Sequence, residues 1–364
     1  MVTTRGSTTV TTVGTTATPI TWPAALPQHA RLGVWAPSCP GPVVFPRRFG
    51  RGLAALRAAG YTVTAGKSCD AALGAGTLAP NALAAELHEL LDECDGVVAA
   101  VGGWTLTSVL PHIDWDRVGR AAKPIIGYSD ITSLLNLTAR RAGLVAFHGP
   151  MVISEWGEAD GPWLHTGAEF TAVLADEHWT SHRVPPATEW SDENLFWDRD
   201  DTRRQRGNSG DQPVRSLRAG LAEGPLWGGS LVVLGLLLGT PLWPEPEPGS
   251  IVVIEVDGIA PDELWARLTQ FRLAGVFDRA SAVVVGKIGK PGRCPSGFAD
   301  FDEVIRACVP TPVAAGFDIG HTEPMATLPI GGRARLTCPD SAAPELVLLR
   351  EEGQCWRDGA SRRE

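Results

Sequence analysis

Short apolar runs alternate with amphipathic segments along residues 31–151 of the chain. The segments 49–59 and 81–91 carry apolar side chains at helical spacing between successive runs. The runs that predict strands are 31–37, 62–66, 96–103, 124–130 and 144–151. Strands that alternate with helices in this way predict a parallel sheet covered on both faces, whose strand-end loops form the ligand crevice.

A second series of apolar runs follows in the last 150 residues. The segments 249–258, 281–289 and 312–320 predict strands, 261–274 predicts an amphipathic helix, and 334–349 is rich in β-formers. The run 226–243 predicts a buried helix, because glycines and Pro241 leave its uninterrupted part too short to span a bilayer. The expected fold class is α/β, with a parallel-sheet N-terminal domain and a smaller β-rich α/β C-terminal domain that meet between residues 217 and 243.

The remaining segments lack this periodicity. Residues 1–27 are rich in Thr, Pro and Gly and predict a disordered leader. Residues 154–223 are polar and rich in Trp and Pro, which indicates an insertion or lid with a linker and not a core element. The predicted division is a leader (1–27), an N-terminal domain (28–153), the insertion (154–223), a C-terminal domain (224–350) and a tail (351–364).

The charge balance narrows the range of partners. The 364-residue chain has a formal net charge of −9, which argues against a nucleic-acid groove or an anionic membrane surface. Small molecules or peptides are the expected partners. The seven cysteines are scattered without C-x-x-C spacing, so we expect neither a disulfide framework nor a zinc site. Reduced thiols and the absence of an apolar signal segment near the N-terminus predict a cytoplasmic protein.

One strand-to-helix turn carries a serine. In KPIIGYSDITSLLN (123–136), a buried strand leads through Ser129 and Asp130 into a helix. This placement exposes a hydroxyl next to helix N–H groups, which can face the charge that develops on an attacked carbonyl. The turn differs from the G-x-S-x-G elbow because Ile131 stands where that motif has glycine. The alternative is that Ser129 or Asp130 only caps the helix.

A serine nucleophile needs a base and an acid that orients the base. His321 follows a predicted strand and begins a turn-rich segment, HTEPMATLPIGG, which could carry it over a crevice. Glu255 ends the apolar run IVVI, where a carboxylate is rarely buried unless it is paired. A hydrogen bond from His321 would supply that partner, although a surface or structural role remains the alternative for a single histidine.

With these residues in place, the chain resembles the LD-carboxypeptidase and microcin C immunity family of serine peptidases from about residue 31 to 349. The order and spacing of the matching pieces carry the resemblance. The pieces are APS (36–38), VGGWTLTSVLPHID, KPIIGYSDITSLLN, FHGPM, GPLWGGSLVVLGLLLGTP, SIVVIEVDG, LTQFRLAGVFD, VVVGK and GFDIGHTEPMATLPIG.

The resemblance implies a Ser-Glu-His triad in a cleft between the two domains. Ser129 would be the nucleophile, His321 the general base and Glu255 the residue that orients the imidazole. The backbone N–H groups of Gly103 and Asp130 would form the oxyanion hole, and glycine suits a position where backbone approaches substrate closely. No metal or cofactor is implied, and a homodimer is expected.

The insertion resembles the microcin immunity branch more than the muropeptide enzymes. That branch cleaves an amide in an aminoacyl-nucleotide, and an aromatic residue of the insertion stacks on the nucleotide. Trp197 is the first candidate for stacking and Trp190 the second. The other expected substrate-binding residues are Gly102, Trp104 and Ser230.

Three departures from the family pattern bear on the substrate. Val256 stands where the family often has a second acidic residue, and Ser230 stands where it usually has asparagine. The segment Ile288-Gly289-Lys290 lacks the carboxylate that microcin-type members carry there and that could pair with a substrate amine. The natural substrate is therefore not necessarily microcin C itself.

Three functions remain open at this point. The first is a serine carboxypeptidase or amidase of the microcin immunity type, acting in self-immunity or detoxification on an aminoacyl-nucleotide-like or peptide compound. The second is an LD-carboxypeptidase that releases the terminal D-alanine of muropeptides during peptidoglycan recycling. The third is a non-catalytic α/β binding protein in which the serine only caps a helix.

Overall fold

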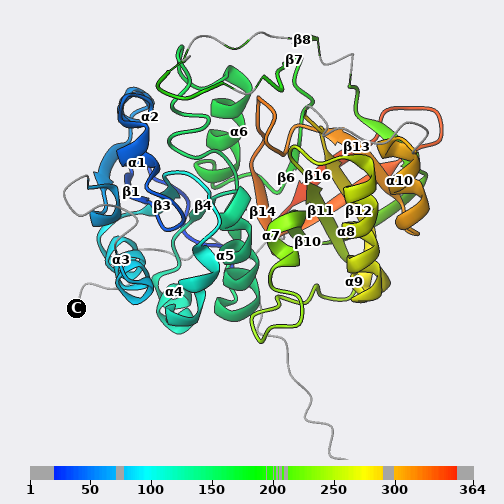
Figure 1. Cartoon of the computed structure of the whole chain (residues 1–364), viewed down its shortest axis with the longest axis horizontal. Helices are drawn as coiled ribbons and strands as arrows, with labels where there is room; N and C mark the ends of the chain where they lie inside the picture. The colour runs from blue at the N-terminus through cyan, green and yellow to red at the C-terminus, as the bar shows by residue number, and fades with distance from the viewer. Residues whose placement is uncertain are drawn as a thin grey trace, which may run out of the picture.

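The computed structural model describes residues 20–70, 78–193, 195–199, 201, 204, 207–208, 212–289 and 299–350. It has two α/β lobes side by side, each built around one large sheet (Figure 1). Buried apolar residues form two core clusters. The larger cluster runs from the first lobe onto the second sheet, and the smaller one lies within the second lobe. The predicted α/β class is confirmed.

The first lobe holds a six-stranded sheet in the order β14-β5-β4-β3-β1-β2. Its parallel strands are β1 (Arg31–Trp35), β2 (Thr62–Ala65), β3 (Gly96–Ala99), β4 (Ile125–Gly127) and β5 (Ala146–His148). The strand β14 (Leu328–Ile330) pairs antiparallel with β5, although it comes from the C-terminal part of the chain. The helices are α1 (Gly41–Val44), α2 (Pro46–Ala58), α3 (Pro80–Glu93), α4 (Trp115–Ala121), α5 (Thr132–Leu137) and α6 (Leu164–Leu174).

The second lobe holds an eight-stranded sheet in the order β6-β16-β15-β10-β11-β12-β13-β9. Four neighbouring strands run parallel: β10 (Gly220–Ser230), β11 (Ser250–Glu255), β12 (Ala280–Gly286) and β13 (Val313–Phe317). The antiparallel flanks are β6 (Ser181–Arg183), β9 (Arg215–Arg218), β15 (Arg333–Cys338) and β16 (Glu345–Leu349). The helices are α7 (Leu231–Gly235), α8 (Pro261–Leu273), α9 (Val276–Arg279) and α10 (Phe301–Cys308). A small hairpin joins β7 (Glu189–Trp190) to β8 (Gly207–Asn208).

The prediction of one buried helix over residues 226–243 is wrong. The run begins as the end of β10, continues as the five-residue α7, and then passes through turns. Gly228 and Gly229 have φ values of 126° and 130°, which an L side chain rarely adopts. A Cβ at Gly228 would also lie 2.1 Å from the carbonyl oxygen of Val253 on the neighbouring strand. The glycines therefore fit a strand that is packed closely against its neighbours.

Two predicted segment boundaries are also corrected. Residues 20–27, expected in the leader, pack against the first lobe: Trp22 and Leu26 are each 1% exposed, and Thr21 N donates to Gly143 O at 2.9 Å. The segment 154–223 is not one insertion, because α6 buries Phe170 and Val173 in the first lobe and β6 and β9 join the second sheet. The rest of the predicted leader (1–19) and the tail (351–364) lie outside the described residues.

Candidate active site

Ser129 stands between β4 and α5, on the predicted turn. Its φ is 58°, in the left-handed region that residues other than glycine seldom adopt, and such strain tends to collect at functional sites. It begins a 3₁₀ turn (Ser129–Ile131) that leads into α5. The residues that cap this turn and α5 are Tyr128 and Ile131, and neither makes a side-chain cap bond. The helix-cap interpretation of Ser129 is therefore not supported.

Three side chains from the two lobes form one hydrogen-bonded chain. His321 Nε2 lies 3.2 Å from Ser129 Oγ, and His321 Nδ1 lies 2.7 Å from Glu255 Oε2. Glu255 ends β11 and is fully buried, whereas the His321 side chain is 27% exposed. Residues 129, 255 and 321 are far apart in sequence, and the fold brings them together in the order that a serine nucleophile, a base and an orienting carboxylate require.

The two charged partners shift each other's pKa. Burial alone would lower the pKa of His321, but the negative charge and hydrogen bond of Glu255 outweigh it and raise that pKa to about 9. Burial would raise the pKa of Glu255, and the charge and hydrogen bond of His321 lower it below its usual range. Glu255 therefore stays ionised and stabilises the imidazolium form of His321.

The loop after β3 lies directly against the serine. A Cβ at Gly102 would approach Ser129 Cβ and Oγ to 2.8 Å, and one at Gly103 would lie 2.6 Å from Ser38 O. Asp130 is buried, and its Oδ2 accepts a hydrogen bond from Leu106 N at 3.0 Å. The Asp130 side chain thus anchors the glycine loop, while its backbone N–H remains the expected oxyanion donor.

Side chains of α5 hold the two lobes in register. Asn136 Nδ2 donates to Gly228 O at 2.9 Å, and Asn136 Oδ1 accepts from Gly228 N at 2.9 Å. Thr132 Oγ1 accepts from Ser230 N at 3.1 Å. Ser230 pairs in register with Glu255 on β11. The helix that follows Ser129 is therefore bonded to the strand next to the one that carries Glu255.

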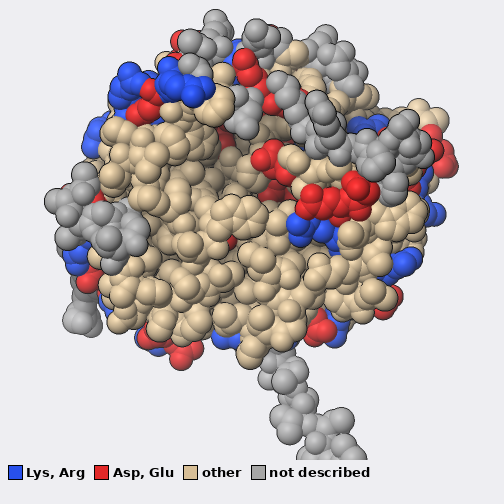
Figure 2. Space-filling model, viewed as in Figure 1, with Lys and Arg blue, Asp and Glu red and all other residues tan. Residues whose placement is uncertain are grey.

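A cleft of about 500 Å³ opens above Ser129 and His321. Figure 2 shows a hollow on this face of the molecule with acidic side chains along its margin. Of the predicted substrate-binding residues, the lining of the cleft includes Gly102, Trp104, Trp197 and Ser230, and it also includes the expected oxyanion-hole residue Gly103. Trp104 is 65% exposed, which leaves its ring accessible to a ligand.

The two tryptophans of the predicted insertion differ. Trp197 lines the cleft, with its ring 5.2 Å from that of Phe45 and 4.9 Å from the Arg48 guanidinium. Trp190 is 9% exposed and is not among the described residues that line the cleft. The prediction of Trp190 as a stacking residue is therefore not supported, because β7 holds its ring in a packed position.

Several cleft residues were not expected from the sequence. They are Tyr128, Glu155, Asp192, Glu193, Arg204, Asp257 and Glu323. Glu323 belongs to the HTEPM segment already singled out for His321, so this motif carried a usable signal. Arg204 and Glu193 lie in the charged part of the predicted insertion, where sequence alone gives no register. Among the described residues, no group of three or more His, Cys, Asp or Glu side chains is arranged to hold a metal ion.

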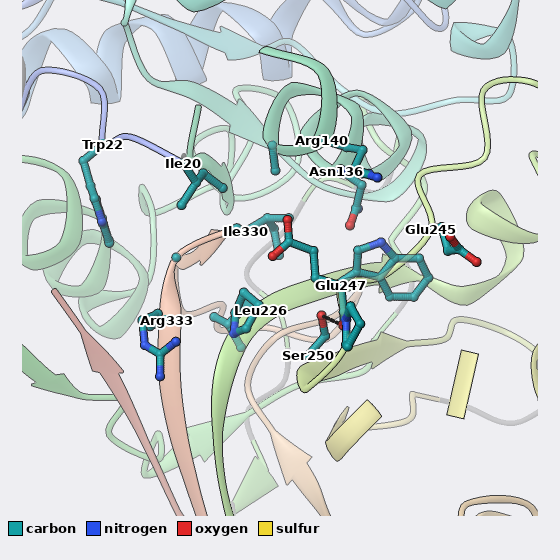
Figure 3. A pocket seen from close by; sticks show the side chains of 16 residues that line it. Ile20, Trp22, Asn136, Arg140, Leu226, Glu245, Glu247, Ser250, Ile330 and Arg333 are labelled. Atoms are coloured by element: carbon teal, nitrogen blue, oxygen red, sulfur yellow. Dashed lines mark hydrogen bonds between the residues drawn. The ribbon is translucent and has the colours of Figure 1, made fainter. Parts of the chain in front are cut away.

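A second cavity of about 330 Å³ lies between the lobes, near the C-terminal end of α5. Asn136 and Arg140 come from a helix on one side, and Leu226, Ser250 and Arg333 come from the strands on the other (Figure 3). The described residues that line it include no histidine, and Ser250 Oγ donates to Glu247 O at 2.7 Å. This cavity holds no activated nucleophile among its described lining residues.

None of the helices in the described part of the chain has the length and apolar character that a membrane span requires.

Comparison with known proteins covers both lobes. Residues 32–149 match the family described as the LD-carboxypeptidase N-terminal domain, and residues 223–336 match the LD-carboxypeptidase C-terminal domain. The microcin C7 self-immunity protein of Escherichia coli is 30% identical over 307 residues, or 82% of this chain and 88% of that protein. A probable murein peptide carboxypeptidase of Bacillus subtilis (strain 168) is 28% identical over 328 residues, or 88% of this chain and 93% of that protein.

Solved structures extend the likeness to three dimensions. The microcin C7 self-immunity protein in complex with aspartyl sulfamoyl adenosine gives a TM-score of 0.81 at 26% identity. The match covers 92% of this chain and 99% of that chain. The two-lobed fold and the family resemblance predicted from the sequence are both confirmed.

Proposed function

Since the chain belongs to the LD-carboxypeptidase and microcin immunity family of serine peptidases, we propose that it hydrolyses an amide through a Ser129-His321-Glu255 triad. The observation that carries this proposal is the pair of hydrogen bonds that link Ser129 Oγ to His321 and His321 to the buried Glu255. The strained φ of Ser129 and the cleft above it support the same assignment.

The reaction would follow the acyl-enzyme route of serine hydrolases. Neutral His321 takes the proton of Ser129 as Oγ attacks the carbonyl carbon, and the backbone N–H groups of Gly103 and Asp130 stabilise the oxyanion. Protonated His321 then gives that proton to the leaving nitrogen, and the C–N bond breaks to leave an ester on Ser129. Water, deprotonated by His321, hydrolyses the ester and restores the hydroxyl.

For the substrate, we propose an aminoacyl-nucleotide-like compound or a related peptide, as in the microcin immunity branch. Trp197 on the cleft wall supports this choice, because an aromatic ring can stack on a nucleobase. Exposed Trp104 and the backbone of Gly102 and Ser230 complete the proposed binding surface. The expected homodimer and cytoplasmic location stay predictions.

A hydrolysis screen tests this proposal. Purified protein is incubated with aspartyl sulfamoyl adenosine and, separately, with a tetrapeptide muropeptide, and products are separated by chromatography. We expect release of the amino acid from the nucleotide compound by the native protein and none by Ser129→Ala. Cleavage of the muropeptide alone would instead support the LD-carboxypeptidase alternative, which the likeness to the Bacillus subtilis protein keeps open. Absence of both reactions would contradict the proposal.

A further inference from the structure

Glu323 carries a buried carboxyl group in the cleft, and it has no role in the mechanism described above. It is 3% exposed, lines the cleft, and its Oε2 has no hydrogen-bond partner. Two backbone hydrogen bonds with Ser191, at 2.7 and 2.9 Å, fix the backbone of Glu323. They join the segment around β7 to the loop that carries His321. A rigidly held and buried carboxyl oxygen without a partner is costly, and this suggests that a ligand supplies the missing contact.

The neighbouring acids differ from Glu323 because they are already satisfied. Glu155 Oε1 accepts from the Tyr128 hydroxyl at 2.7 Å, and its Oε2 accepts from Ser154 Oγ at 2.6 Å and Met151 N at 2.7 Å. Glu158 Oε1 accepts from Arg204 Nε at 2.9 Å and also contacts Arg48. Glu323 is thus the member of this group left to bind something else.

The charge of the cleft indicates the chemistry of that ligand. Five of the described residues that line the cleft carry carboxyl groups: Glu155, Asp192, Glu193, Asp257 and Glu323. The basic groups among the described lining residues are Arg204, which pairs with Glu158, and His321, which pairs with Glu255. Acidic groups outnumber basic groups among these lining residues, so the lining favours a cationic ligand group over an anionic one.

We propose that Glu323 binds an ammonium group of the substrate, so that this protein selects compounds with a free primary amine near the scissile amide. The inference rests on the proposed amidase function. In this proposal the loop that carries His321 supplies the carboxylate that binds the substrate amine. The segment after β12 cannot supply it at Ile288 or Gly289, since neither residue has a carboxylate.

The protonation state of Glu323 should change when an ammonium group binds, and this change can be measured. Burial and the charges of Glu155 and Glu158 raise the pKa of Glu323 well above its usual range, and Arg204 and Arg48 only partly oppose this. This shift favours the protonated form of the carboxyl group while the cleft is empty. An arriving ammonium ion favours the carboxylate, so the proton leaves Glu323 for solvent as the ion pair forms.

Calorimetry on the Ser129→Ala protein tests the inference without turnover. The two ligands are aspartyl sulfamoyl adenosine and succinyl sulfamoyl adenosine, which lacks only the α-amino group. We expect about tenfold tighter binding of the amine, and a net release of protons when titrations in two buffers are compared. Adding Glu323→Gln should bring the two affinities within about twofold and abolish the proton release.

A second substitution in the cleft serves as the control for Glu323→Gln. Asp192→Asn removes a lining carboxylate, and it should leave most of the amine preference intact. The proton release is measured in protein with native Glu323, so this measurement can be made even if the Glu323→Gln variant fails to fold. Equal affinities for the two ligands, or a preference that survives Glu323→Gln, would overturn the inference.

If neither nucleotide compound binds, the rate at which a fluorophosphonate labels Ser129 tests for the ammonium site. Labelling itself reports the reactive serine of the proposed function. Slower labelling in the presence of n-butylammonium, but not of n-butanol, would support an ammonium site, and this protection should be lost in Glu323→Gln. Labelling that n-butylammonium leaves unchanged would refute the ammonium site while leaving the reactive serine established.

Discussion

Two acid–base pairs lie at the same edge of the second sheet, and only one of them reaches the cleft. Glu255 ends β11 and pairs with His321, whereas Lys287 follows β12 and pairs with Asp318, which follows β13. The Lys287 and Asp318 side chains are each 1% exposed, while His321 is 27% exposed and contacts Ser129. Neither Lys287 nor Asp318 is among the described residues that line the cleft, so we interpret this sealed pair as structural.

The comparison shows that a charge pair becomes chemically useful through access and not through charge alone. Asp318 Oδ2 also accepts from Ala187 N at 2.9 Å, and its carbonyl oxygen accepts from Ala326 N at 2.7 Å. These bonds shape the segment that carries His321. The sealed pair thus fixes the loop on which the accessible pair is presented.

The strongest test of the accessible pair removes its reactive partners. We expect Ser129→Ala and His321→Ala each to lower kcat/KM by about 10⁴-fold or more, because the triad acts as a unit. Ser129→Ala should leave the thermal stability nearly unchanged, since it leaves the His321–Glu255 pair in place. Steady-state kinetics with the substrate found in the hydrolysis screen measure the effect. Activity within a few-fold of the native value in either variant would rule out this triad.

The sealed pair should respond in stability. Asp318→Asn leaves the Lys287 ammonium buried without its counter-charge, so the free energy of unfolding should fall by about 3–5 kcal/mol. Glu263→Gln serves as the control, because it breaks an exposed pair with Arg267 on α8 and should cost less than about 1 kcal/mol. Denaturant unfolding curves measure both, and equal costs would contradict the distinction drawn between the pairs.

The pH profile should sharpen the role of the accessible pair. His321 must be neutral to accept the proton of Ser129, and its pKa is raised to about 9. We therefore expect kcat/KM to rise about tenfold per pH unit from pH 7 and to level off above pH 9. Glu255→Gln removes the stabilising anion, so its profile should shift to lower pH with a reduced maximum. A native profile that is flat above pH 7 would contradict the assigned pKa.

The smallest expected effect concerns the contact that keeps the two halves of the triad in register. Asn136→Ala removes both hydrogen bonds to Gly228 and should lower kcat by about tenfold, because small misplacement of the nucleophile is costly. KM should change less, since Asn136 does not line the cleft. Gln270→Ala on α8, outside this contact, is the control and should keep native kcat. A loss in KM alone would argue against a positioning role.

Much of the first lobe was predictable because its strands and helices follow simple periodicities. The strands β1, β3, β4 and β5 fall within the predicted runs, and Ser129 lies on the predicted turn. The pairing of Ser129, Glu255 and His321 was expected from residue chemistry and resemblance, and the distances agree with it.

What sequence alone missed depends on tertiary contacts. The run that contains Gly228 resembles a helix in composition, but its form is decided by the close approach of Val253 from β11. The burial of Trp22 depends on the first lobe that packs around it, as shown by the 6.2 Å separation of its ring from that of Phe147. The role of Glu323 could not be predicted, because an unpaired buried carboxyl group is recognisable only when its neighbours are known.

The strand β14 has a consequence for how the protein is made. It completes the first sheet beside β5, yet it follows His321 in the chain. During translation the edge of β5 therefore stays uncovered until residue 330 has left the ribosome, and an uncovered strand edge invites wrong pairing. The nascent chain cannot finish its first lobe before its last catalytic residue has been synthesised. A product that ends before His321 would thus lack both a catalytic residue and β14, and its open strand edge would make it a target for chaperones or proteases.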